Sequence, residues 1–191
     1  MNDALDQTLE QQREAFSARR FLAMPLAGTI VWLIIGVIGA TMPIHIAVWS
    51  VWIGAGSTFY LGVAISKITG ENFLAKNKPK NVFDRLFMSG LLMALLVFAI
   101  AMPFAQVDYT SIPMTVGILA GLMWMPLSWI INHWVGYFHA IARTLAIIAA
   151  WYTFPEHRFV VIPAIIVVVY IISIAALELR YARIQKVSAA L

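Results

Sequence analysis

The sequence predicts an all-α fold, a polytopic transmembrane bundle of about six helices with both termini in the cytoplasm. Of the 191 residues, 62% are hydrophobic and 12% are charged, whereas a soluble domain carries about 25% charged residues. The mean hydropathy is +0.85. The apolar residues form segments long enough to cross about 30 Å of hydrocarbon as helices, and lysines and arginines cluster between alternate segments.

The first 20 residues are polar and predict an amphipathic helix in the cytoplasm. Leu5, Leu9 and Phe16 share one helical face loosely, with charges elsewhere. This weak apolar stripe favours a solvated or surface-lying tail, with a partner-binding helix as the alternative. Residues 1–20 lack the apolar core of a signal peptide, so we expect the next apolar segment to be a retained helix.

Residues 21–178 are expected to form the transmembrane domain, and residues 179–191 a basic cytoplasmic tail. Each span has the length of a membrane-crossing helix. A short turn near 132–136 separates the fourth span from the fifth, because polar residues interrupt the apolar run there. The six expected spans are 21–40, 44–66, 86–104, 112–131, 136–154 and 159–177.

The distribution of basic residues sets the orientation. Eleven of the thirteen lysines and arginines lie before the first span, between the second and third spans, or after the sixth. Because positive residues are retained on the cytoplasmic side of short loops, both termini are predicted to be cytoplasmic. Glu178, near the end of the sixth span, is expected to pair with a nearby basic residue such as Arg180 or Arg183.

Several classes of function are disfavoured by what the sequence lacks. It contains no cysteine, which excludes disulfides, thiolate metal sites and a cysteine nucleophile. The net charge of +4 is explained by membrane topology rather than by nucleic-acid binding. No phosphate loop, nucleophile elbow or dinucleotide fingerprint occurs, so we expect no cofactor and an enzyme is disfavoured.

Small residues recur at four-residue spacing in two of the spans. Such faces let helix backbones approach closely in lipid, so packing within the bundle or between protomers is favoured over a pore lining. The residues are Gly54, Thr58, Gly62 and Ser66 in the second span and Gly117 and Gly121 in the fourth.

Pro126 interrupts the fourth span. Since it cannot donate to the carbonyl of Leu122, that carbonyl must be satisfied by Ser128, another helix, water or a ligand. A kinked helix is the expected result. Kinks of this kind line substrate cavities in transporters, although many are only architectural.

The best site candidate is a polar group where the fourth span meets the fifth. His139 and Arg143 are spaced i, i+4 and share a helical face; with His133 they could bind an anion or relay protons. The alternative is that these residues contact lipid phosphate at the interface. The predicted solute or ion path comprises Trp124, Pro126, Ser128, Asn132, His133, His139 and Arg143.

A second cluster comes from three connections on the other side of the membrane: His45, Asp108, Glu156 and His157. Two histidines and two carboxylates could hold a divalent metal if these connections converge. Because they are far apart in the sequence, no metal is expected and the four remain weak candidates.

Four short motifs carry a resemblance that covers nearly the whole chain. They are Met-Pro-Leu-Ala-Gly at 24–28, Lys-Asn-Lys-Pro at 76–79, Trp-Met-Pro-Leu-Ser-Trp at 124–129 and Phe-Pro-Glu-His-Arg-Phe at 154–159. The sequence resembles an uncharacterised family of small six-helix bacterial integral membrane proteins. The resemblance implies a bacterial cell (inner) membrane location and supplies no activity. In that family a histidine typically occupies the position of Trp124, so no role is carried over to that residue.

The leading functional hypothesis is a channel or permease for a small solute or ion, expected as a homo-oligomer in the lipid bilayer. It rests on a broken helix, small-residue faces and polar groups within the spans. A non-catalytic scaffold or accessory subunit, docking through the N-terminal segment or a helix face, is the second hypothesis. The third is a membrane enzyme acting on lipid or quinone head groups with His133 or His139 as acid or base, for which a nearby carboxylate is missing.

Overall fold

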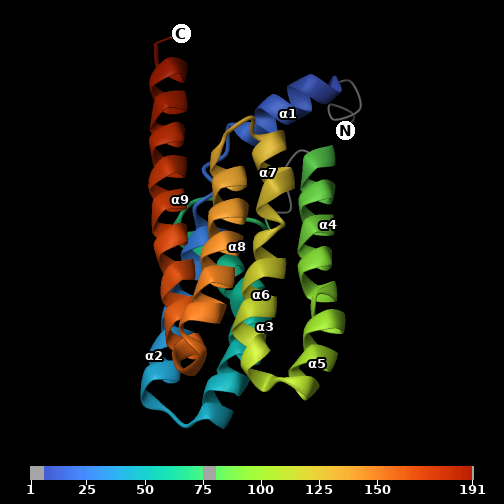
Figure 1. Ribbon diagram of the computed structural model, residues 1–191. Coiled ribbons are helices and arrows are strands. Elements are labelled where there is room, and N and C mark those ends of the chain that lie inside the picture. The colour runs from blue at the N-terminus through green and yellow to red at the C-terminus, as the bar shows by residue number, and fades with distance from the viewer. Residues whose placement is uncertain (1–6, 75–80, 191) are drawn as a thin grey trace.

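The computed structural model describes residues 7–74 and 81–190, and all regular secondary structure in them is helical (Figure 1). α1 and the C-terminal turns of α9 lie at one end of the bundle, here called the α1 end; the α2–α3 connection lies at the opposite end. The elements in chain order are α1 (Leu9–Ser17), α2 (Ala23–Thr41), α3 (Ile44–Ile68), α4 (Val82–Leu96), α5 (Phe98–Val107), η1 (Tyr109–Ser111), α6 (Ile112–Gly121), α7 (Trp124–Ile130), α8 (Val135–Thr153), η2 (Pro155–His157) and α9 (Arg158–Ser188).

Within the described residues, five helical segments are long and apolar enough to cross a membrane. They are Ala23–Thr41, Ile44–Ile68, Val82–Val107, Tyr109–Ile130 and Pro155–Val187. The predicted all-helical membrane fold is thereby confirmed. α8 has the 19 residues of a crossing helix and lies alongside α9 (Figure 1), but it is not among the five and it carries His139 and Arg143.

The core of the bundle lies where α2 packs on α3 and α9, and where α8 packs on α9, α6 and α7. Trp32, Ile35, Ile147, Ile162 and Ile166 fill it. The α4–α5 segment is peripheral, because only 6% of its apolar window is buried, against 44% for α9. Lipid chains would satisfy its remaining apolar surface, as they do for any membrane helix.

Two predicted spans are interrupted helices. The fourth divides into α6 and α7 at Leu122 and Met123, before Pro126. The carbonyl of Leu122 accepts the backbone N–H of Met125 at 3.1 Å, so the expected contribution from Ser128 or a ligand is not needed. Pro126 itself is exposed. The third span begins earlier than predicted and divides into α4 and α5 at Val97, and Pro103 lies inside α5. In the fourth span the proline ring crowds the turn before it.

The N-terminal segment forms the expected helix, α1, and it lies docked on the surface of the bundle rather than free in solvent. Phe16 is 2% exposed and its ring lies 6.0 Å from that of Phe83 on α4. The side-chain amide of Asn81 donates to the backbone carbonyl of Gln12 at 2.7 Å. Leu5 and the 76–79 motif lie outside the described residues. Residues expected as a separate C-terminal tail continue α9 as far as Ser188.

Candidate functional site

A large cavity of about 1850 Å³ lies between α3 and α4 and extends to α6, α7 and α8. Its walls are mostly apolar and aromatic. The side chains that line it include Phe59 on α3, Phe87 and Leu91 on α4, Val116 on α6, Trp124 on α7 and Tyr170 on α9. Arg143 on α8 is the one charged lining residue that is fully buried among the described residues.

Side chains from α1 and α5 border the cavity. At the α1 end, Gln12 and Phe16 of α1 are part of its lining. Toward the opposite end, the ring of Trp52 on α3 lies 5.4 Å from that of Phe98 on α5. The cavity is partly open at its side, because lining residues such as Met88 and Leu95 on α4 are half exposed.

Arg143 is held by a chain of buried hydrogen bonds. The hydroxyl of Ser173 donates its hydrogen to the carbonyl of Val169 at 2.8 Å, so it accepts from Nδ1 of His139 at 2.9 Å. Nε2 of His139 then accepts from Nη1 of Arg143 at 3.2 Å, because an arginine can only donate. The network thus assigns a neutral, Nδ1-protonated imidazole to His139.

Aromatic rings enclose this pair. The indole of Trp124 stacks on His139 with 3.9 Å between ring centroids and 9° between planes. Tyr170 meets the other rings edge-on, 4.7 Å from His139. The Arg143 guanidinium lies 5.6 Å from the ring of Trp32 and 5.5 Å from that of Tyr170. These π faces give the cation part of the stabilisation that an ion pair would give elsewhere.

Two nitrogens of Arg143, Nε and Nη2, make no hydrogen bond of standard geometry, and the residue is 1% exposed. The guanidinium also interacts with the side chain of Tyr170. The ion pairs found in the described part of the chain involve other arginines, at Arg13, Arg19, Arg20 and Arg158. A buried cation with unused donors is costly in hydrocarbon, which makes it a mark of function. Chemically, the site offers a fixed positive charge and two N–H groups to an acceptor.

The predicted path residues divide into two groups. Trp124, His139 and Arg143 come together in the buried site. Asn132 and His133 instead form the turn between α7 and α8. Asn132 has a φ of 47°, and His133 N–H donates to the carbonyl of Ser128 at 3.1 Å, a bond typical of a Schellman helix end.

Ser128 and His133 serve this turn and not the Arg143 site. The hydroxyl of Ser128 donates to the carbonyl of His133 and accepts the N–H of Tyr137 at 3.2 Å. Desolvation lowers the pKa of the His133 imidazole, and the cations Arg180 and Arg183 lower it further. His133 is therefore neutral at pH 7.

The small residues predicted for packing border α2, the core and the cavity. A Cβ at Gly54 would lie 3.0 Å from side-chain atoms of Ile35 and Val31 on α2, and one at Gly117 would lie 3.0 Å from Ile147 on α8. Gly62 lies against Met24 of α2. Thr58 lines the cavity, and a Cβ at Gly121 would lie 3.2 Å from Nε of Arg143. Ser66 is buried and accepts the N–H of Phe73 at 3.2 Å.

The weak metal candidates do not form a site in the described residues, where no group of three or more potential ligands occurs. Asp108 accepts from the backbone of Thr110 at 2.8 Å and lies 3.8 Å from Nη1 of Arg158. Arg158 in turn stacks on Trp151 at 3.3 Å. The remaining candidates, His45, Glu156 and His157, are exposed.

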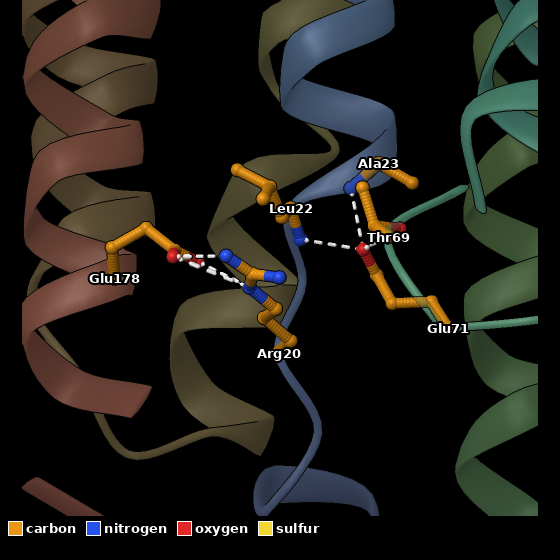
Figure 2. A network of polar contacts seen from close by, with 6 residues as sticks. All are labelled: Arg20, Leu22, Ala23, Thr69, Glu71 and Glu178. Atoms are coloured by element: carbon orange, nitrogen blue, oxygen red, sulfur yellow. Dashed lines mark hydrogen bonds and ion pairs between the residues drawn. The ribbon is translucent and has the colours of Figure 1, made fainter. Parts of the chain in front are cut away.

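A polar network lies at the N-terminal end of α2 (Figure 2). Nε and Nη2 of Arg20 bind the carboxylate of Glu178 on α9, at 2.9 Å and 2.6 Å, and this hydrogen bonding raises the pKa of Arg20. The expected partners of Glu178, Arg180 and Arg183, are replaced by Arg20. Glu71 accepts the N–H groups of Leu22 at 3.0 Å and Ala23 at 2.7 Å, which caps α2.

Sequence reasoning missed Trp32, Tyr170 and Ser173, which come from α2 and α9. Within apolar spans, aromatic residues are ordinarily interpreted as core residues or as interface anchors. The available signal was chemical: Tyr170 and Ser173 are the two hydroxyl side chains in the expected span 159–177. Polar groups in a membrane helix face partners inside the bundle.

This fold and buried site define the class, an all-helical, multi-pass membrane protein with a cationic site inside its bundle. The chain belongs to the family described as a family of unknown function (DUF7010), whose model matches residues 9–180. Membership of an uncharacterised family is thereby confirmed. Comparison with the curated proteins and with the solved structures finds no match.

Proposed function

We propose that the protein is a permease that carries a small anionic solute across the membrane, with Arg143 as the residue that binds it. The observation that carries the proposal is the Arg143 guanidinium, which is buried beside a large cavity with two unused nitrogens. Arginine at the centre of a membrane helix costs roughly 2.5–3.5 kcal/mol on insertion scales. A purely structural role could be filled by an apolar residue without that cost.

The proposal includes α8 as a sixth crossing, with both termini in the cytoplasm. Support comes from its 19 residues and from its packing against α6, α7 and α9. Six crossings agree with the clustering of basic residues at the chain ends and between the second and third spans. Arg143 then lies about midway along α8, within the hydrocarbon.

A cavity inside the bundle that reaches a buried arginine suits a carrier that opens alternately to each side. At the α1 end, opening would separate α1 from α4, where Arg19 binds the carboxylate of Asp84. At the opposite end, it would separate Trp52 from Phe98. A continuously open channel draws less support from this arrangement.

The other two hypotheses also draw less support. The scaffold hypothesis relied on the N-terminal segment as a docking surface, but the apolar face of α1 is already used by Phe16 against Phe83. The enzyme hypothesis needed an accessible histidine with a carboxylate. His139 is buried with both nitrogens engaged, and His133 belongs to a helix turn.

The test is anion flux in proteoliposomes. We expect the wild-type protein to transport at least one of chloride, phosphate, acetate, benzoate or dodecanoate, and Arg143→Gln to abolish that transport. Arg183→Gln makes the same substitution at an exposed position near the C-terminal end of α9. It is the matched control and should transport normally. The proposal is wrong if no anion moves, or if Arg143→Gln folds and transports like the wild type.

A further inference from the structure

We infer that the ligand of this site is an amphiphilic carboxylate, with its head group on Arg143 and its hydrocarbon tail in the cavity. The inference rests on the proposed function, because it names the substrate class of the same site. It is carried by the edge of the guanidinium that is free, by the chemistry of the cavity wall and by the packing between α3 and α4.

The free edge of Arg143 has the geometry for a carboxylate. Nε and Nη2 point to the same side of the planar guanidinium and form a two-pronged donor. The protein itself contains this interaction: Arg20 holds the Glu178 carboxylate with the same two nitrogens (Figure 2). At Arg143, Nη1 is occupied by His139, so the Nε and Nη2 edge is the one left for a ligand.

Gly121 on α6 makes room beside this edge. A Cβ at that position would lie 3.0 Å from Cδ and 3.2 Å from Nε of Arg143, closer than an unstrained contact. An alanine there would therefore crowd the donor edge without removing the charge.

The rest of the cavity suits a tail and not a hydrated ion. Away from the α1 end its walls are formed by side chains such as Phe59, Phe87, Leu91, Phe98 and Val116. Its volume of about 1850 Å³ exceeds the roughly 300–1,000 Å³ of an ordinary small-molecule pocket. A small inorganic anion would lose its hydration shell along such walls with only one cation to replace it.

The bilayer is the expected source of such a ligand. The cavity separates α3 from α4, and α4 has its main contacts with α1, α5 and α7. Nε and Nη2 each expose less than 1 Å², so neighbouring side chains cover this edge of the guanidinium. The rings of Trp32 and Tyr170, which line the cavity next to the guanidinium, must shift before a carboxylate reaches it.

The experiment measures saturable binding of radiolabelled dodecanoate to the full-length protein in nanodiscs, with protein-free nanodiscs as background. We expect one site per chain, at least about tenfold weaker binding by Arg143→Gln and by Gly121→Ala, and intermediate binding by Arg143→Lys. Gly90→Ala, where a Cβ meets nothing within 4 Å, should bind like the wild type. Dodecanol should not compete, and neither should acetate.

The outcomes separate this inference from the proposed function. Dodecanol competing as well as dodecanoate, or folded Arg143→Gln and Gly121→Ala both binding like the wild type, would overturn the carboxylate assignment. Phosphate or chloride flux that depends on Arg143, without dodecanoate binding, would overturn the inference and leave the permease. Dodecanoate binding that depends on Arg143, without flux of any anion including dodecanoate, would support the assignment and overturn the permease.

Discussion

At the scale of single residues, the central feature is a cation without a carboxylate. Arg143 is held in place by one imidazole nitrogen and by two aromatic faces. His139 acts as a positioning residue, since its orientation is fixed by Ser173 on one side and by the stacked Trp124 on the other. This arrangement orients the guanidinium while leaving its outer edge unsatisfied.

Removing the anchor of His139 should loosen the site. Ser173→Ala leaves Nδ1–H of His139 without its acceptor, and we expect a loss of about 1 kcal/mol in the free energy of unfolding. Ser57→Ala is the matched control, because Ser57 is exposed and bonds only its own helix, at Gly54. Thermal unfolding in detergent compares the two. Equal losses in both variants would mean that the Ser173–His139 bond contributes nothing.

The turn between α7 and α8 should make stability depend on pH. The pKa of His133 is lowered in the folded state by desolvation and by Arg180 and Arg183. The unfolded chain therefore binds this proton first, near pH 6.5. The stability that neutral His133 preserves is fully present above that pH and is lost as the pH falls through the folded-state pKa.

We accordingly expect the melting temperature to fall between pH 7.5 and pH 5, and to fall less in His133→Gln. His45→Gln, at an exposed position in the first turn of α3, is the control and should follow the wild type. An identical decline in His133→Gln and the wild type would contradict this role.

The pairing of His139 with Arg143 could be predicted from the sequence, because i, i+4 spacing places two side chains on one helical face. The same reasoning wrongly grouped Ser128, Asn132 and His133 with them. Residues that are close in sequence need not share a site when a turn separates them. Asn132 adopts a left-handed conformation in the turn that leads into α8. Trp32, Tyr170 and Ser173 reach the site from helices that are far away in the sequence.

At the scale of elements, α1 borders one end of the cavity. It is fixed by Phe16 against Phe83 and by Arg180, whose Nη2 donates to the carbonyl of Ser17 at 2.6 Å. Composition could not predict this docking, because the apolar stripe of the segment is weak and its partners lie on α4 and α9. Pro126 predicted the interruption between α6 and α7, which falls at the crowded carbonyl of Leu122, but the interruption between α4 and α5 was not predicted.

Removing the Phe16 side chain should expose α1 without unfolding the bundle. Phe16→Ala removes a side chain that is 2% exposed, whereas Leu9→Ala changes one that is 63% exposed on the same helix. We expect hydrogen exchange of the α1 amides to accelerate at least about tenfold in Phe16→Ala and to stay unchanged in Leu9→Ala. Equal protection of the α1 amides in both variants would show that Phe16 does not hold α1 against the bundle.

At the scale of the whole molecule, length and composition were sufficient to predict an all-helical membrane protein. Hydrocarbon leaves the backbone no other partner than itself, so long apolar segments must be helical. The cavity could not be predicted in this way. It arises because α4 is peripheral and separated from α3, a spacing that no single span encodes.

The proposed role of Arg143 requires that α8 crosses the membrane, because only then does Arg143 lie inside the hydrocarbon. Since the chain has no cysteine, single substitutions at the two ends of α8 report its sidedness. The substitutions are Trp134→Cys and Thr153→Cys, both at exposed positions. Labelling with a membrane-impermeant maleimide should modify Thr153→Cys in intact cells and Trp134→Cys only after permeabilisation. Labelling of both positions from the same side would contradict the account.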